Sequence, residues 1–280
     1  MSIESPEAKI LAEQMNKELR GKRVRSCSLL DYDKLQRIGM MDRDLTSFDK
    51  LAGGRVEAVV SRGNTIRLKL DNGMNLILGL EYGGNILYHG SQKTVATKFH
   101  LKVDFADDTA ITVRLTSMGQ ISACGDHHLE RSYVFRRDFN PDVDSPLDQR
   151  LTFGRLSQLL TDSNRMLKSV LVGKDAILVG LSNSAFQDII YRARLHPKRK
   201  ASELSEAERR ALYDAINLVI GERIRLNGKE QFQDLYGNKG GYVPAMGPHM
   251  KQQSCPTCGN TVEKLSIGGG QVYFCRKCQV

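Results

Sequence analysis

The chain has 280 residues, 40% hydrophobic and 26% charged, which is enough for two domains with real cores and a small additional module. Its formal net charge of +9 favours a polyanionic partner, because each Lys or Arg that contacts a phosphate releases counterions. No apolar run approaches the ~20 residues that span a bilayer and the N-terminus does not resemble a signal peptide, so we exclude a membrane protein and expect a cytoplasmic location.

The first predicted element is a helix over residues 6–20. Apolar residues recur every four positions from Leu11 to Leu19, Pro6 lies in the first turn, and Ser5 is expected to cap it.

Residues 23–124 carry a different pattern, with alternating or short apolar runs separated by turn residues. Turns are expected at 71–73 and 106–108. The pattern predicts antiparallel strands that form a sandwich or barrel. The clearest runs lie at 55–60, 65–70, 75–80, 99–105 and 109–115.

After a proline-bearing linker at 139–146 the chain becomes helical. Ser205 and Glu208 form a predicted capping box at the start of the longest helix. Residues 227–251 are rich in glycine and are expected to be a loop. The candidate helices are 153–160, 164–170, 184–193 and 205–224.

The chain ends with two Cys-x-x-Cys pairs, Cys255/Cys258 and Cys275/Cys278, separated by sixteen residues. This spacing can place four thiolates around Zn²⁺ at ~2.3 Å. The intervening residues predict a hairpin with strands at 261–267 and 271–274 and three glycines at the turn. A disulfide pair is the alternative, which a cytosolic protein disfavours, and a structural metal without a binding role is another.

A cationic cluster lies at residues 192–200, where Arg192, Arg194, Lys198, Arg199 and Lys200 follow an apolar helix. Such a run is often only a solvated face, but beside a basic zinc hairpin it suggests part of a nucleic-acid surface.

These elements, in this order, resemble the formamidopyrimidine-DNA glycosylase / endonuclease VIII family along almost the whole chain. The resemblance implies an α+β multidomain fold, with an N-terminal helix and β-sandwich over 1–140, a helix-two-turn-helix domain over 141–228, and a linker and Cys₄ zinc finger over 229–280. The matching segments are Glu4–Glu7, Val179–Asn183, Ala193–Pro197, Asp234–Gly237, Gly240–Tyr242 and the four cysteines.

The resemblance also implies DNA repair by covalent catalysis. In that family a free N-terminal proline amine attacks C1′ of a damaged nucleotide, and a glutamate transfers protons. A lysine on a strand and an arginine in the zinc finger bind the phosphates around the extruded nucleotide. Glu4 and Glu7, with the neighbouring Ser2 amine, are the catalytic candidates, although both glutamates would also favour the helix dipole. The nucleic-acid-binding candidates are Lys168, Asn183, Arg192 and Arg194.

The sequence departs from the family pattern at the positions of the catalytic and phosphate-binding residues. Ile3 stands where the nucleophilic proline is expected, Asn64 replaces a strand lysine, and Gly270 replaces the arginine of the finger. Ser182 occupies a usual glycine position, and the loop that fills the gap left by an extruded base has no match near residues 114–118.

Three functions therefore compete. The first is a monomeric, nucleoid-associated protein that binds damaged or distorted double-stranded DNA between its sandwich and helical domains, with its catalytic residues largely lost. The second is an active glycosylase or abasic-site lyase that uses the Ser2 amine or an internal lysine. The third is a binder of structured RNA or of a ribonucleoprotein, because phosphate contacts alone do not distinguish DNA from RNA.

Overall fold

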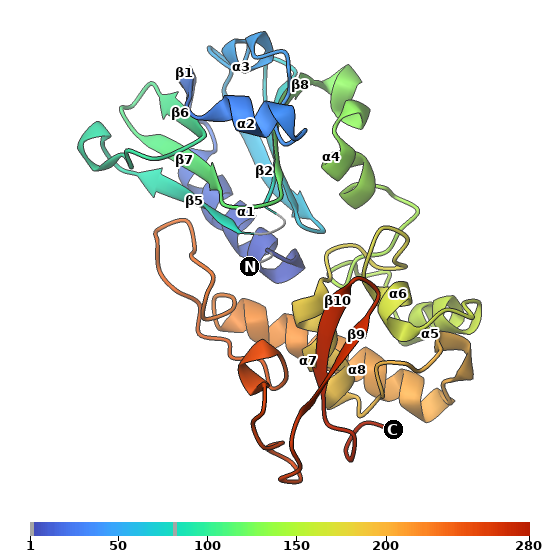
Figure 1. Cartoon of the computed structure of the whole chain (residues 1–280). Coiled ribbons are helices and arrows are strands. Elements are labelled where there is room, and N and C mark those ends of the chain that lie inside the picture. Colours follow the sequence, from blue (N-terminus) through green and yellow to red (C-terminus); the bar gives the residue numbers. More distant parts are fainter. Residues whose placement is uncertain (1–2, 81–82) are drawn as a thin grey trace. The chain divides into compact units, whose positions relative to one another are not determined.

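The computed structural model describes residues 3–80 and 83–280 (Figure 1). The chain divides into two compact units, Met1–Asn140 with Leu226–Gly241 and Pro141–Arg225 with Tyr242–Val280. The sequence placed residues 229–241 with the linker and finger, whereas the structure places them with the first unit. The reason is local packing, because Phe232 and Leu235 join the hydrophobic core of that unit.

The described residues of the first unit form two four-stranded antiparallel sheets, β1-β6-β7-β5 and β2-β3-β4-β8. Strands β2, β3, β4, β6 and β7 correspond to the five predicted runs, while β1, β5 and β8 carry weaker apolar patterns. The strands are β1 (Val24–Leu29), β2 (Val56–Arg62), β3 (Thr65–Leu70), β4 (Met74–Gly79), β5 (Gly84–His89), β6 (Leu101–Phe105), β7 (Ala110–Leu115) and β8 (Gln120–Gly125). The helices are α1 (Ser5–Leu19), α2 (Tyr32–Arg37), α3 (Thr46–Asp49), α4 (Tyr133–Asp138), η1 (Gln92–Thr94) and η2 (Asp126–Arg131).

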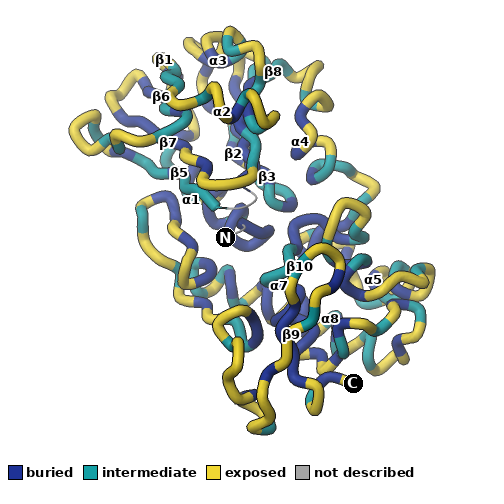
Figure 2. The backbone as a smooth tube through the Cα atoms, viewed as in Figure 1, coloured by how far each residue is buried: buried dark blue, intermediate teal, exposed yellow. Residues whose placement is uncertain are grey.

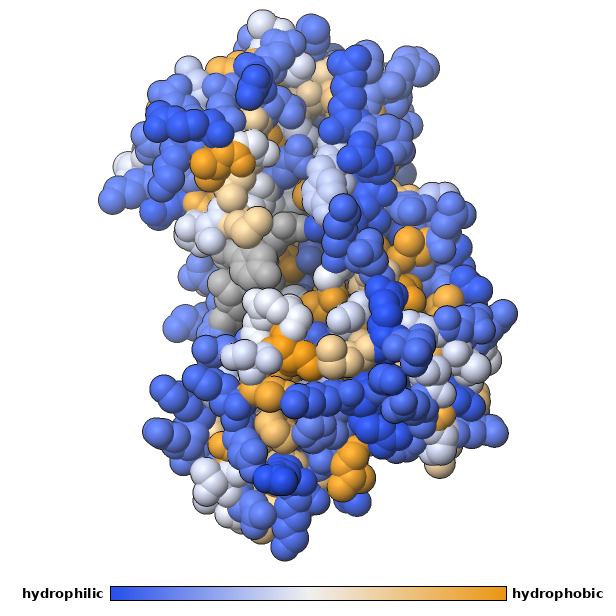
Figure 3. Space-filling view, turned by 45° about the vertical axis from the view of Figure 1, so that its right-hand side comes forward, coloured by the Kyte–Doolittle hydropathy of each residue, from blue (hydrophilic) through white to orange (hydrophobic). Residues whose placement is uncertain are grey.

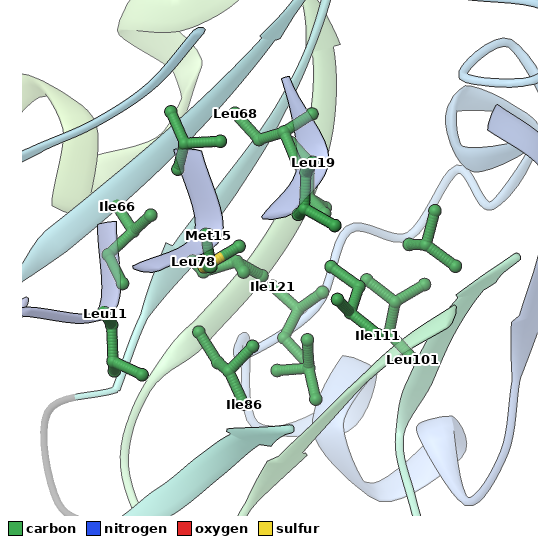
Figure 4. Close-up of a cluster of buried hydrophobic side chains, with 14 of the residues drawn as sticks. Leu11, Met15, Leu19, Ile66, Leu68, Leu78, Ile86, Leu101, Ile111 and Ile121 are labelled. Atoms are coloured by element: carbon green, nitrogen blue, oxygen red, sulfur yellow. The ribbon is translucent and has the colours of Figure 1, made fainter. Parts of the chain in front are cut away.

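The core of the first unit lies where α1 and the inner faces of both sheets meet. Leu11, Met15 and Leu19 of α1 are fully buried and belong to one cluster with Ile66 of β3 and Ile111 of β7 (Figure 4). The four-residue spacing of the apolar side chains thus fixes which face of α1 is buried.

The cap of α1 differs from the prediction. The N-cap residue is Glu4, in extended backbone conformation, and Ser5 is the first helical residue. Glu4 and Glu7 form a capping box, in which the backbone N–H of Glu4 donates to Glu7 Oε2 at 3.1 Å. A carboxylate cap satisfies the free amide and also favours the positive end of the helix.

The second unit contains the predicted helices and a C-terminal hairpin. Ser205 Oγ accepts a hydrogen bond from the backbone N–H of Glu208, and Glu208 Oε2 accepts one from that of Ser205, which confirms the predicted capping box. The elements are α5 (Phe153–Thr161), α6 (Leu167–Leu171), α7 (Asn183–Arg192), η3 (Ala201–Glu203), α8 (Glu206–Arg225), η4 (Pro248–Met250), β9 (Glu263–Ile267) and β10 (Gly270–Phe274).

The hairpin turn consists of two glycines. Ile267 pairs with Gly270, and Gly268 and Gly269 between them have φ of +53° and +73°. A two-residue turn with two positive φ angles favours glycine at both positions. β10 is buried over its last three residues and packs on α7, whereas β9 is largely exposed (Figure 2).

In the part of the chain that the structure describes, no helix combines the length and the hydropathy that crossing a membrane requires.

Candidate metal centre and nucleic-acid interface

The four C-terminal cysteines gather at one point, as their spacing predicted. All four Sγ atoms lie within 4.8 Å of one another, with Cys258 and Cys275 at 3.4 Å and Cys255 and Cys278 at 3.9 Å. Thiolates at ~2.3 Å around a tetrahedral metal lie ~3.8 Å apart, so the cluster fits such an ion. Zinc as the metal stays a prediction.

Tyr191 of α7 contacts the first cysteine of the cluster, Cys255. Its hydroxyl lies 3.3 Å from Cys255 Sγ and 2.7 Å from Thr257 Oγ1, and burial raises its pKa to about 12. The sequence suggested only a position at the edge of the cationic cluster. A hydrogen bond to a ligand sulfur orients the ligand, so Tyr191 supports the metal centre from outside it.

Lys168 of α6 and Asn183 of α7 meet beneath the hairpin. Lys168 Nζ donates to Asn183 Oδ1 at 2.6 Å, and Asn183 Nδ2 donates to the carbonyl oxygen of Gln271 at 2.7 Å. The Lys168 side chain is 3% exposed, and burial lowers its pKa. Two predicted binding residues, from consecutive helices, therefore share one hydrogen-bonded site.

Gly268 of the turn and Gly270, the first residue of β10, allow this approach. A Cβ atom on Gly270 would lie 3.1 Å from Lys168 Nζ, and one on Gly268 would lie 3.4 Å from Lys168 Cγ. The position at which the family resemblance expects an arginine is thus next to a lysine amine from another element.

The two arginines predicted to bind nucleic acid have different surroundings. Arg192 Nε donates to Asp188 Oδ1 at 3.0 Å, and its guanidinium also lies 3.4 Å from the Tyr242 hydroxyl. Asp188 is 1% exposed, so Arg192 neutralises a buried carboxylate. Arg194 follows α7 with φ of +57° and is exposed. Of this pair, Arg194 presents the more available charge.

The glutamates at the N-terminus are both buried. Glu4 Oε2 lies 3.0 Å from Lys229 Nζ, Glu7 Oε1 accepts the backbone N–H of Lys229 at 3.3 Å, and Lys229 is 3% exposed. No pattern in the sequence pointed to Lys229, which lies in a glycine-rich loop. Ser2 lies outside the described residues.

Ile3 is part of the core at the position expected for the nucleophile. Its side chain is 5% exposed, and its backbone N–H donates to the carbonyl oxygen of Leu80 at 3.2 Å. An amide nitrogen in a peptide bond cannot attack a sugar carbon as a free amine does.

The turn between β2 and β3 forms hydrogen bonds with the carboxylate of Asp138. The backbone N–H of Asn64 donates to Asp138 Oδ2 at 3.0 Å, and Thr65 Oγ1 donates to the same oxygen at 2.7 Å. Gly63, with φ of +56°, leaves room for that carboxylate. Asn64, where a lysine is expected, therefore adds no positive charge to this turn.

Comparison with protein families matches two models to this chain. Residues 3–120 match the N-terminal domain of formamidopyrimidine-DNA glycosylase, and residues 143–233 match the H2TH domain of the same enzyme. A formamidopyrimidine-DNA glycosylase of Roseiflexus sp. is 26% identical over 284 residues, covering 99% of both chains. One from Bacillus cereus is 27% identical over 239 residues, covering 82% of this chain and 83% of the relative.

Solved structures show the same fold. Lactococcus lactis Fpg in complex with DNA containing N7-benzyl-Fapy-dG has a TM-score of 0.83 at 20% identity, with 99% of each chain covered. MutM (Fpg) of Thermus thermophilus has a TM-score of 0.80 at 23% identity, covering 99% of this chain and 98% of that one. The predicted fold class is therefore confirmed.

Proposed function

Because the chain belongs to the formamidopyrimidine-DNA glycosylase / endonuclease VIII family, we propose that it is a zinc-containing protein that binds damaged or distorted double-stranded DNA. We further propose that base excision is largely lost, so that binding rather than catalysis is its main activity. A DNA-bound protein of this kind resides at the nucleoid.

The convergence of Lys168 and Asn183 under the finger turn carries the binding proposal. A lysine amine offers three donors, of which Asn183 takes one among the described residues. A phosphate oxygen can accept from Lys168 Nζ and from Asn183 Nδ2, displacing the bond to the carbonyl of Gln271. The face of the molecule in Figure 3 is largely hydrophilic, and the net charge is +9, which suits a polyanion better than an apolar partner.

Three observations support the loss of excision. Ile3 offers a hydrogen-bonded amide in place of a free amine. The carboxylate of Glu4 is buried against Lys229 and caps α1, which gives it a structural role. The lysine and arginine positions hold Asn64 and Gly270, and losing a positioned charge of this kind costs ~10²-fold or more in rate.

Duplex binding measured over a salt series tests the binding proposal. We compare a duplex that contains an abasic-site analogue with an undamaged duplex and with a structured RNA. Each phosphate contact contributes about 0.9 to the steepness of the plot of log K against log salt concentration. Lys168→Ala removes about one contact, so the slope is expected to become less steep by about 0.9. Lys17→Ala, at an exposed lysine of α1, is the matched control. An unchanged slope in Lys168→Ala, or tighter binding to the RNA, would contradict the proposal.

The Lys229–Glu4 pair favours a second candidate, an abasic-site lyase that uses an internal amine. Once its proton has moved to Glu4, Lys229 Nζ could attack C1′ of the ring-opened abasic sugar, with loss of water, to form an imine. Elimination of the 3′ phosphate would then nick the strand.

Borohydride trapping on an abasic duplex separates the two candidates. Reduction of an imine leaves a covalent protein–DNA adduct. An adduct that persists in Lys229→Met points to the Ser2 amine, whereas one that is lost in Lys229→Met but kept in Lys17→Met points to Lys229. Absence of any adduct, together with measurable binding, supports the binding protein.

A further inference from the structure

The outer face of β8 carries polar residues that neither the core nor the proposed function uses. Ile121 and Ala123 point into the core of the first unit, so Ser122 and Cys124 point to the opposite face. Ser122 pairs across the sheet with Ile77, which packs under α4 with Val134. The face is therefore partly covered, because α4 packs on Ile77 and α3 contacts β8.

A pocket of about 440 Å³ opens on this face. This volume falls in the range that binds small molecules in proteins. Its walls come from four segments, which are the α3 region, the start of β4, β8, and η2 with the residue that follows it. The residues that carry charged, imidazole or hydroxyl side chains there are Asp42, Arg43, Asp44, Ser47, Lys50, Ser122, His128, Arg131 and Ser132.

Three cationic side chains and two carboxylates line the pocket, an excess of one positive charge. Arg43, Lys50 and Arg131 line it, and within the described residues no hydrogen bond or ion pair engages the guanidinium of Arg43 or of Arg131. The two carboxylates each accept a backbone hydrogen bond. Asp42 Oδ2 accepts the N–H of Ala123 at 2.9 Å, at the free edge of β8, and Asp44 Oδ1 accepts the N–H of Thr46 at 3.0 Å. Burial raises the pKa of Asp42 to about 6, so this carboxylate opposes an anion less strongly only below that pH.

Ser122 is a buried residue that lines the pocket. Its side chain is 3% exposed, and its Oγ atom has no hydrogen-bond partner in the described part of the chain. A buried hydroxyl without a partner costs about 1–3 kcal/mol, so a partner supplied by a ligand is favoured.

We propose that this pocket binds a small phosphate monoester of the size of a sugar phosphate or mononucleotide. The phosphate would accept from Ser122 Oγ and from the guanidinium groups of Arg43 and Arg131, since arginine binds phosphate with two parallel hydrogen bonds. A monoester carries ~1.5–2 negative charges and three acceptor oxygens, which matches several cations better than a carboxylate does.

The site is separate from the residues discussed above for DNA. Ile3 bonds to Leu80, next to the end of β4 at which Gly79 pairs with Gln120, whereas the pocket lies at the other end, where Met74 pairs with Gly125. Six strand residues span ~16 Å at ~3.3 Å each. Binding here does not depend on the proposed DNA function.

Calorimetric titration of the full-length, zinc-loaded protein with ribose 5-phosphate tests the proposal, with ribose and inorganic phosphate as comparisons. We expect ribose 5-phosphate to bind, ribose not to bind, and inorganic phosphate to bind more weakly. Arg131→Ala should weaken ribose 5-phosphate at least tenfold and Ser122→Ala about fivefold, while Arg37→Ala, at an exposed arginine of α2, changes nothing.

Amide chemical shifts locate the ligand. Changes centred on Ser122 to Gly125 support the site. Changes centred on Lys168 and Asn183 would instead assign the phosphate to the second unit and overturn the proposal. Equal affinity in the wild type and Arg131→Ala, or absence of binding, would also overturn it. Arg131 is exposed, so its variant folds and keeps the experiment decisive even where Ser122→Ala does not fold.

Discussion

Replacing Lys229 by Met should destabilise the first unit strongly. Lys229 and Glu4 are 3% and 0% exposed, and their Nζ and Oε2 atoms are 3.0 Å apart. Removing one partner of a buried ion pair costs about 3–5 kcal/mol, because the other charge stays in the core. Glu4 keeps the hydrogen bond of its capping box, so we expect the lower end, about 3 kcal/mol. At 2–4 °C per kcal/mol this lowers the melting temperature by about 6–12 °C.

Differential scanning calorimetry measures this loss. The transition of the first unit should move, while that of the second unit provides an internal reference. Lys17→Met, at an exposed lysine of α1, is the matched control, with a change below about 0.5 kcal/mol. In the double variant Glu4→Gln/Lys229→Met both charges of the pair are removed and neither is left without the other, so we expect it to recover about 2 kcal/mol relative to the sum of the two single losses.

Two results would refute this reasoning. A loss below about 1 kcal/mol in Lys229→Met would mean that the pair contributes no more than an exposed one. Simple additivity of the two single losses in the double variant would mean that the two side chains are not coupled, and the structural role given to Glu4 would then have no basis.

Three further predictions concern the metal, the β8 edge and the finger. Cys255→Ser or Cys278→Ser should lower the bound zinc, measured by atomic absorption, below one equivalent and make the residues after about 250 sensitive to protease. The reason is that metal binding supplies the folding free energy of so small a hairpin. A full equivalent of zinc together with unchanged protease resistance would rule this out. Asp42 has a folded pKa of about 6, above its unfolded value of ~3.9, so its contribution to stability falls as the pH rises from about 4 to about 6. In urea denaturation, Asp42→Asn should be as stable as the wild type at pH 4 and about 1 kcal/mol more stable at pH 7, after discounting for partial exposure. A variant that is less stable than the wild type at pH 7 would contradict this. Gly270→Arg should place a cation beside Lys168, because only the flexible end of the lysine side chain must move to make room. One additional phosphate contact would steepen the salt dependence of duplex binding by about 0.9. An unchanged slope would show that the finger turn does not face a phosphate.

The sequence was most informative where residues close together in the chain form a pattern that is compatible with a single local structure. The spacing of the four cysteines predicted their cluster, and the four-residue spacing from Leu11 to Leu19 predicted the buried face of α1. The capping box at Ser205 was also predicted correctly. In each case the residues that determine the structure lie within a few turns of helix or in one hairpin, so the pattern is visible in the order of the residues.

Tertiary structure decided what depends on residues that are distant in sequence. Nothing near Lys229 indicates that it meets Glu4, and the capping prediction of Ser5 was wrong because the neighbouring glutamate has the stronger acceptor. The same holds for Tyr191, whose hydroxyl reaches Cys255. A residue's type shows which interactions it can make, but only folding determines which partner it finds.

The site follows the same division. The sequence by itself determined the family, the thiolate cluster and the identity of the residues at the nucleophile, lysine and arginine positions. Only the tertiary structure brought Lys168 and Asn183 together below Gly270, paired Arg192 with Asp188, and left Ser122 buried in the lining of a pocket. The physical reason is that burial and hydrogen bonding depend on the packing of whole elements, which a linear pattern of residue types does not contain.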